Sequence, residues 1–223
     1  MRQIFLFMAL LIPVTVNAQN KFETVDRKKI QSAVKKSSGK EYKSVVERFN
    51  RFDTTLTLDD YRLIYYGFAF QKSYNGYADH RRKDIVEAID KKDFKMAVAI
   101  CDSVLADIPI SLIANYWKGI ALAMEKDDKE LARPYLKRFY GLQNAILSSG
   151  DGLECETAFK VLYIPDEYNL MYKYFEVKNF KGQALVGNCD RMNIDPSDFF
   201  DTDHMYFDAS ELLMNLQKTL RGK

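Results

Sequence analysis

The chain has 223 residues, of which 47% are hydrophobic and 29% charged, and its 33 Lys and Arg side chains nearly balance 31 Asp and Glu side chains. This composition excludes a globally disordered or collagen-like chain, because enough apolar surface is available to form a core. The formal net charge of +2 argues against a nucleic-acid-binding protein, in which a strongly basic surface is expected.

The first 18 residues have the layout of a secretory signal peptide. Arg2 supplies a short basic region, the apolar run 4–16 carries no charge, and Ala18 closes a cleavage site of small residues. A helix over that run would be about 20 Å long, too short for a hydrocarbon core of about 30 Å, which disfavours the alternative of a membrane anchor. We expect cleavage after Ala18, export to the periplasm or the extracellular space, and a mature chain from Gln19 onward that does not span a membrane.

Residues 19–150 are predicted to be helical. Thr57 and Asp60 form a capping box at the start of one helix, which continues to Lys72. Pro134 lies inside another predicted helix and is expected to kink it. Apolar side chains recur at helical spacing in six segments, 26–36, 45–52, 57–72, 84–109, 115–122 and 128–140.

The segment 84–111 has the spacing of the second helix of a tetratricopeptide repeat. Phe94 and Ala97 provide the large and the small residue of that motif, and Pro109 would end the helix because it has no N–H group. Gly119, on the next helix, is small enough to permit a close approach between helices. We predict a stack of tetratricopeptide-like helical hairpins, and the alternative is a plain helical bundle in which Gly119 is only a contact point.

Residues 151–223 form a second part with a different pattern. Short β-prone segments are found at 157–164, 183–186, 190–194 and 205–207. Gly187-Asn188 fits a hairpin turn, and Asp208 fits the start of a final helix. The predicted fold class is therefore α+β, mainly α: tetratricopeptide-like helical hairpins followed by a small antiparallel β-meander and a C-terminal helix. Because so small a unit is not expected to fold alone, it should pack on residues 19–150 as one unit.

The three cysteines are compatible with export. Cys101 lies in an amphipathic helical pattern and is expected to be a small buried apolar residue. Cys155 and Cys189 lie in loop-rich sequence and are a possible disulfide pair, although sequence does not give the geometry that decides it. Such a bond would stabilise the fold by about 4 kcal/mol.

Residues 53–77, DTTLTLDDYRLIYYGFAFQKSYNGY, together with the later stretches QALVGNCD and MYFDASELL, resemble an uncharacterised family of exported Bacteroidetes proteins. That family is classified only as a domain of unknown function. Its hallmarks are the YYG helix at 65–67 and the preceding cap at 56–61, and the similarity extends over about 26–213. The resemblance implies export and a single folded unit, and it carries over no catalytic residue.

Motifs for catalysis or metal binding are not recognisable. His80 and His204 are the only histidines and lie in different regions, and no pair of cysteines has the spacing of a zinc site. The Asp residues at 195–208 lack the spacing of a calcium loop. A nucleophile elbow, a phosphate-binding loop and a zinc-protease motif are also missing. We therefore expect no catalytic residue, no cofactor and no metal.

The aromatic residues of 61–77 suggest a role in binding. Most of them are expected to pack in the core, but helical repeats bind peptides on a concave face where Tyr and Arg act as anchors. The candidate groove residues are Arg62, Tyr65, Tyr116 and Arg138. The predicted function is an exported, non-enzymatic protein- or peptide-binding or scaffold module that acts on an envelope protein or peptide. The alternative is a hydrolase or small-ligand-binding protein with a site at the helix–strand junction.

Overall fold

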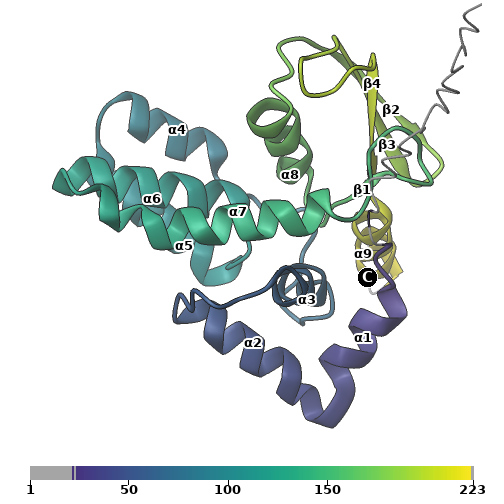
Figure 1. The fold of residues 1–223 in the computed structure, drawn as a ribbon, viewed down its shortest axis with the longest axis horizontal. Coiled ribbons are helices and arrows are strands. Elements are labelled where there is room, and N and C mark those ends of the chain that lie inside the picture. The colour runs from purple at the N-terminus through teal and green to yellow at the C-terminus, as the bar shows by residue number, and fades with distance from the viewer. Residues whose placement is uncertain (1–21, 23, 222–223) are drawn as a thin grey trace, which may run out of the picture.

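The computed structural model describes residues 22 and 24–221, and helices make up most of it (Figure 1). The predicted signal peptide at 1–18 lies outside the described residues. The first part contains α1 (Arg27–Lys35), the short 3-10 turn η1 (Lys36–Gly39), α2 (Lys40–Asn50), α3 (Leu58–Phe68), α4 (Arg82–Asp90), α5 (Phe94–Asp107), α6 (Leu112–Lys126), the 3-10 turn η2 (Lys129–Leu131) and α7 (Arg133–Leu147). The second part contains β1 (Phe159–Lys160), α8 (Ile164–Asn169), the π-helical turn η3 (Leu170–Tyr174), β2 (Phe180–Val186), β3 (Cys189–Ile194), β4 (His204–Asp208) and α9 (Ser210–Arg221).

Local sequence chemistry sets several helix ends. The capping box predicted at α3 is confirmed: the Thr57 side chain accepts from the Asp60 N–H, and the Asp60 side chain accepts from the Thr57 N–H. The predicted kink at Pro134 is wrong, because α7 begins at Arg133 and Pro134 lies in its first turn. At that position the missing N–H removes no helical hydrogen bond.

Helices α4 to α7 pack one against the next, and α6 also contacts α4 and α8. In Figure 1 they form a layer on one side of the molecule and the sheet lies on the other side. Helix α3 contacts α7, α1 and α2. Gly119 marks the close approach of α6 and α7. A Cβ added there would lie 3.0 Å from the Ala132 carbonyl oxygen and 3.2 Å from the Tyr135 Cβ.

The sheet has the strand order β1-β4-β3-β2. Strands β2, β3 and β4 form the predicted antiparallel meander, and Gly187-Asn188 makes the turn between Val186 and Cys189. The expectation of a purely antiparallel sheet is corrected, because β1 pairs with β4 in parallel and the sheet is mixed. Strand β1 contains two residues, since Pro165 lies in the first turn of α8 and the chain becomes helical there.

One hydrophobic core runs through both parts of the chain. Tyrosines of α3 and the turn after it also bond across the two parts. Tyr65 donates to the Asp166 carboxylate at 2.6 Å and accepts from the Leu162 N–H at 2.9 Å. Tyr74 donates to the Leu162 carbonyl at 2.9 Å. These bonds fix the segment that leads into α8 against α3.

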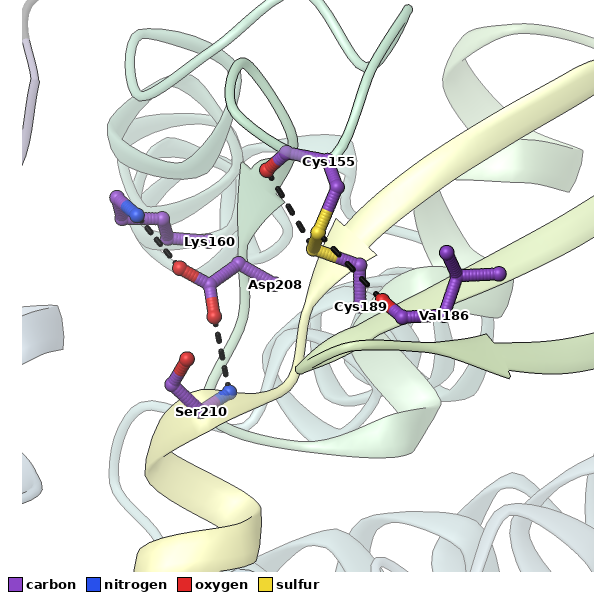
Figure 2. The surroundings of a disulfide bond; sticks show 6 residues. All are labelled: Cys155, Lys160, Val186, Cys189, Asp208 and Ser210. Carbon is purple, nitrogen blue, oxygen red and sulfur yellow. Dashed lines mark hydrogen bonds and ion pairs between the residues drawn. A yellow bond between two sulfur atoms is a disulfide. The ribbon is translucent and has the colours of Figure 1, made fainter.

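Cys155 and Cys189 form a disulfide in the structure, whereas Cys101 is buried and free. Figure 2 shows the bond beside the ion pair of Lys160 and Asp208. It connects the loop after α7 to the first residue of β3. A loop that would otherwise leave the sheet edge is therefore held next to β4.

Between residues 24 and 221 we find no helix with both the length and the apolar character that crossing a bilayer requires.

Candidate binding site

The four residues predicted to line a groove do not meet in one place. Arg62 is buried, and its Nη1 donates to the Ser148 hydroxyl at 2.8 Å. Tyr65 has no exposed surface, so it is a core residue rather than a groove residue. Tyr116 is half-buried on α6, and Arg138 on α7 lines a surface hollow.

The hollow has a volume of about 410 Å³ and lies between the loop after α2 and the first half of α7. Its walls are mainly apolar and come from Phe49, Phe52, Leu56, Tyr61 and Pro134. Its rim is polar and comes from Asp53, Thr54, Glu130, Arg133 and Lys137. An apolar cavity with a few polar groups is the usual form of a ligand-binding pocket.

Ion pairs hold the loop that forms one wall of this hollow. Arg48 pairs with Asp53 at 2.8 Å and with Asp60 at 3.2 Å, and the hydrogen bond from Arg48 lowers the pKa of Asp53. Phe52 has a φ of 58°, a conformation that bulky residues rarely adopt. This conformation is associated with a ring position directly against Arg138. The wall is thus built from a strained residue that its neighbours keep in place.

Arg138 is a buried cation with aromatic neighbours. The residue is 9% exposed, and its guanidinium carbon lies 3.5 Å from the ring centre of Phe52 and 4.5 Å from that of Phe49. Its Nε and Nη2 both donate to the Phe49 carbonyl, at 3.1 and 2.7 Å. Within the described part of the chain, no carboxylate lies within ion-pair distance of it. Burial lowers the pKa of Arg138 to about 10, so the side chain is still charged at neutral pH.

Tyr116 belongs to a second surface, which joins α6, α7 and η3. Its ring lies 5.0 Å from Trp117 and 5.1 Å from Phe139, centre to centre. The Lys173 ammonium of η3 lies 5.1 Å from the centre of the Tyr116 ring. This surface is aromatic and carries one cation, but it does not include Arg138.

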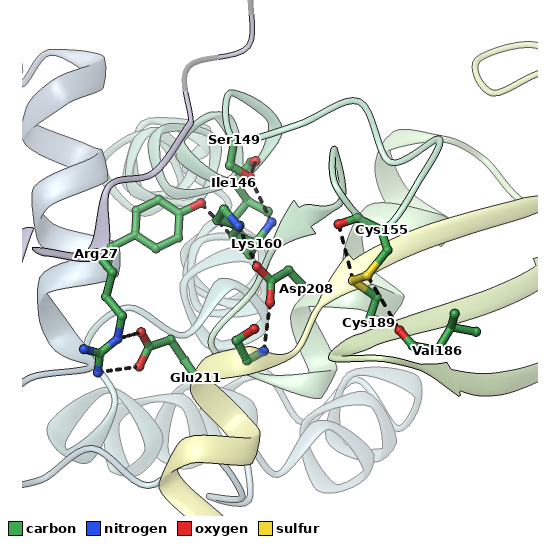
Figure 3. A network of polar contacts seen from close by, with 11 residues as sticks. Arg27, Ile146, Ser149, Cys155, Lys160, Val186, Cys189, Asp208 and Glu211 are labelled. Carbon is green, nitrogen blue, oxygen red and sulfur yellow. Dashed lines mark hydrogen bonds and ion pairs between the residues drawn. A yellow bond between two sulfur atoms is a disulfide. The ribbon is translucent and has the colours of Figure 1, made fainter.

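A smaller pocket of about 200 Å³ lies where α1, α3, β1 and α9 meet (Figure 3). Figure 3 shows two ion pairs beside it, Arg27 with Glu211 and Lys160 with Asp208, the second at 2.5 Å. Asp208 also accepts from the Ser210 N–H at 2.9 Å at the start of α9. The charged groups of this pocket therefore neutralise one another.

Two buried carboxyl groups on α8 were not predicted from sequence. Asp166 and Glu167 have no exposed surface, and Asp166 Oδ1 and both Glu167 oxygens lack a hydrogen-bond partner within the described residues. Burial raises the pKa of Asp166 to about 7 and, together with the nearby Asp190, raises that of Glu167. An acidic pair after a proline is typical of an exposed first helical turn, so the sequence gives no sign of this burial.

No group of three or more His, Cys, Asp or Glu side chains in the described part of the chain is arranged to hold a metal ion. Members of the Asp-rich segment 195–208 instead pair with basic side chains. Asp195 pairs with Lys181, and Asp203 pairs with His204.

A family model described as "Domain of unknown function (DUF4919)" matches residues 28–218. The chain belongs to the DUF4919 family. The match runs from α1 into α9, so the hollow, the aromatic surface and the sheet of this DUF4919 domain all lie within the matched residues. No curated protein and no solved structure shows significant similarity to this DUF4919 domain.

Proposed function

We propose that this DUF4919 domain is an exported, non-enzymatic binding module of the cell envelope, and that its hollow at Arg138 takes up an acidic segment of another protein. The hollow itself is the observation that carries the proposal. It combines apolar walls with three cations, Arg133, Lys137 and Arg138, against two acids, Asp53 and Glu130. An excess of positive charge favours an acidic partner.

The packing of the helices supports a tetratricopeptide-like arrangement. Each of α4 to α7 packs on its successor, and α6 contacts α4, as first helices of successive repeats do. The close approach at Gly119 is in the place where such a repeat has a small residue. Helical repeats of this kind commonly bind segments of other proteins.

Export is supported by two independent features. The predicted signal peptide at 1–18 addresses the chain to the envelope. The Cys155–Cys189 disulfide is stable in an oxidising compartment and rare in the cytosol. The resemblance to exported Bacteroidetes proteins is consistent with both.

The proposal can be tested by selecting a displayed peptide library on residues 19–223. We expect enrichment of peptides that combine Asp or Glu with an apolar residue. Thr54→Trp, which places an indole at the rim, should abolish their binding, whereas the matched control Leu185→Trp, on an exposed position of β2, should not. Equal binding of the selected peptides to the wild type, Thr54→Trp and Leu185→Trp would overturn the proposal, and so would a selection without any enrichment.

A second candidate function, small-ligand binding at the helix–strand junction, is favoured by the 200 Å³ pocket between α1 and α9. Its apolar walls include Ile30 and Phe70. A metabolite that raises the melting temperature of the wild type, but not of Ile30→Trp, would support this function. A shift of equal size in both proteins would exclude the pocket as the site.

A further inference from the structure

Arg138 differs from most buried cations because no acid in the described chain neutralises it. Charged side chains are rarely buried unless they are paired. The rings of Phe49 and Phe52 offset part of the cost through cation–π contact, and the Phe49 carbonyl accepts two hydrogen bonds. These neighbours carry no negative charge, so the guanidinium retains its attraction for an anion.

The hydrogen bonds of Arg138 leave one edge of the guanidinium unused. Nε and Nη2, which form the side edge, both donate to the Phe49 carbonyl. Nη1 has no hydrogen-bond partner among the described residues, and Nη2 has a second N–H. The end edge, formed by Nη1 and Nη2, therefore has the two parallel donors that bind a carboxylate in bidentate fashion.

The other charges around the hollow indicate a single negative charge on the ligand. Lys137 donates to the Thr54 carbonyl, and Arg133 pairs with Glu130 at 3.2 Å. The rim acids Asp53 and Glu130 would repel a dianion such as a phosphate monoester. Arg138 is the cation of the hollow that is buried against aromatic rings, and it matches one carboxylate next to an apolar group.

We propose that Arg138 binds the carboxylate of a glutamate or aspartate side chain that the partner segment inserts into the hollow. This inference rests on the proposed function and names the chemistry of its ligand. The side chain of Arg133, on the rim, is 77% exposed, whereas the whole residue Arg138 is only 9% exposed. A side chain can reach the deeper cation while the partner's backbone stays at the polar rim.

Arginine side-chain NMR of residues 19–223 tests the inference with defined probes. The first probe is 3-phenylpropionate, and its neutral match is 3-phenylpropanamide. We expect the acid to shift the Arg138 Nη signals saturably and to bind at least about tenfold more tightly than the amide, which corresponds to about 1.4 kcal/mol. Equal binding of acid and amide would overturn the proposal.

Variants separate recognition by Arg138 from general electrostatic attraction. Arg138→Gln should weaken binding of the acid at least about tenfold, while Lys91→Gln, which removes an exposed and paired cation outside the hollow, should leave it within about twofold. If Arg138→Gln does not fold, Arg138→Lys keeps the charge but loses the planar fork, and it should bind the acid several-fold more weakly. Equal effects of the Lys91 and Arg138 changes would contradict a specific role for Arg138.

Three capped peptides identify the source of the carboxylate: acetyl-Ala-Glu-Phe-amide, acetyl-Ala-Gln-Phe-amide and acetyl-Ala-Ala-Phe with a free C-terminus. We expect the Glu peptide to bind most tightly and to shift Arg138. Tighter binding of the free C-terminus would overturn the side-chain assignment. If the Glu and Gln peptides bind equally and Thr54→Trp abolishes the binding of both, the binding function stands and the carboxylate inference fails. If neither peptide binds the hollow, the binding function fails as well.

Discussion

Arg138 and Asp166 are both removed from water, and each adapts to burial in a different way. Arg138 keeps its charge, because aromatic rings and the Phe49 carbonyl contact its guanidinium. Asp166 receives a hydrogen bond from Tyr65, and burial raises its pKa to about 7. A cation that keeps its charge attracts an anion, whereas a carboxyl group that retains a proton makes stability depend on pH.

Asp166→Asn should reduce the pH dependence of stability between about pH 4 and pH 7. In this range the folded wild type keeps a proton on Asp166 that the unfolded chain, with an ordinary pKa of 3.8, has released. The free energy of unfolding should therefore fall as pH rises, by at most about 1.4 kcal/mol per pH unit for this group. Urea unfolding at several pH values measures the difference. Glu167 is present in both proteins, so its contribution cancels in the comparison. Parallel curves of unfolding free energy against pH for the wild type and Asp166→Asn would contradict a protonated Asp166.

Gly141→Ala should destabilise the fold through a clash at the wall of the hollow. An added Cβ would lie 2.2 Å from the Tyr61 ring, which lines the hollow. Overpacking of this kind costs about 1–3 kcal/mol, and the urea midpoint should fall accordingly. Asn144→Ala, at an exposed position of the same helix, is the matched control and should change stability by less than about 0.5 kcal/mol. An unchanged midpoint for Gly141→Ala would mean that the ring can move away freely.

The candidate site can be predicted from sequence only in part. Arg138 lines a hollow and its role in binding stays a prediction, whereas Tyr65 is in the core. The aromatic pattern of 61–77 predicts apolar contact on two helix faces without indicating which segment covers each face. The partner of Tyr65 is Asp166, 101 residues later, and so remote a contact leaves no local pattern in the sequence.

At the scale of single elements, the π-helical turn η3 and the Cys155–Cys189 disulfide each connect segments that lie far apart in the sequence. The turn η3 continues α8 and brings Lys173 over the Tyr116 ring of α6. π-Helical turns are rare and are often found at functional sites. The Cys155–Cys189 bond connects the loop after α7 to the sheet.

Replacing both Cys155 and Cys189 by Ala should lower the free energy of unfolding by about 4 kcal/mol, since the bond closes a long loop in the unfolded chain. The two cysteines are 34 residues apart. Urea unfolding of the double variant measures the loss, and the wild type with added reductant should match it. The remaining thiol, Cys101, is buried with its pKa raised to about 12, so it should not react in either protein. A wild type that is insensitive to the reductant would contradict this prediction.

Elements defined by local chemistry are predicted better than those defined by remote pairing. The capping box of Thr57 and Asp60 and the turn at Gly187-Asn188 are confirmed, because neighbouring residues determine them. The parallel pairing of Phe159 with a residue of β4 depends on a strand that follows much later in the chain. A β-prone run such as 157–164 therefore predicts a strand, but it gives neither the length of the strand nor the direction in which it pairs.

At the scale of the whole molecule, α3 packs on α7, and one core connects the helical layer with the sheet. The packing of 151–223 on 19–150 as one unit stays a prediction, and the continuous core favours it. The bonds of Tyr65 and Tyr74 to the segment before α8 lie in the same region. Removal of either part would expose this core to water.

The two parts should open together in native-state hydrogen exchange. We expect the amides of Ile100 in α5 and Met192 in β3 to report the same free energy of opening, because one core contains both residues. A fragment of residues 19–150 should not unfold cooperatively in urea. Two clearly different opening free energies, together with a cooperative fragment, would show two independent domains.

We propose that the chain is exported, and the mature protein should then begin at Gln19. Mass spectrometry of protein recovered from the envelope or the medium of the native host measures this directly. Replacing Ala18 by Asp should block cleavage, because signal peptidase requires a small neutral residue there. An intact Met1 on the wild-type protein would contradict both the cleavage and the export.

The contact between Lys173 and the aromatic surface has an optical consequence. Trp117 is the only tryptophan of the chain, and the Lys173 ammonium lies 5.5 Å from its ring centre. Indole emission responds to a nearby charge and to exposure to solvent. The protein thus contains a single indole fluorophore, which lies at the junction of α6 and η3 and can be excited selectively at wavelengths where tyrosine hardly absorbs. Its emission will report any separation of these two elements without an added label.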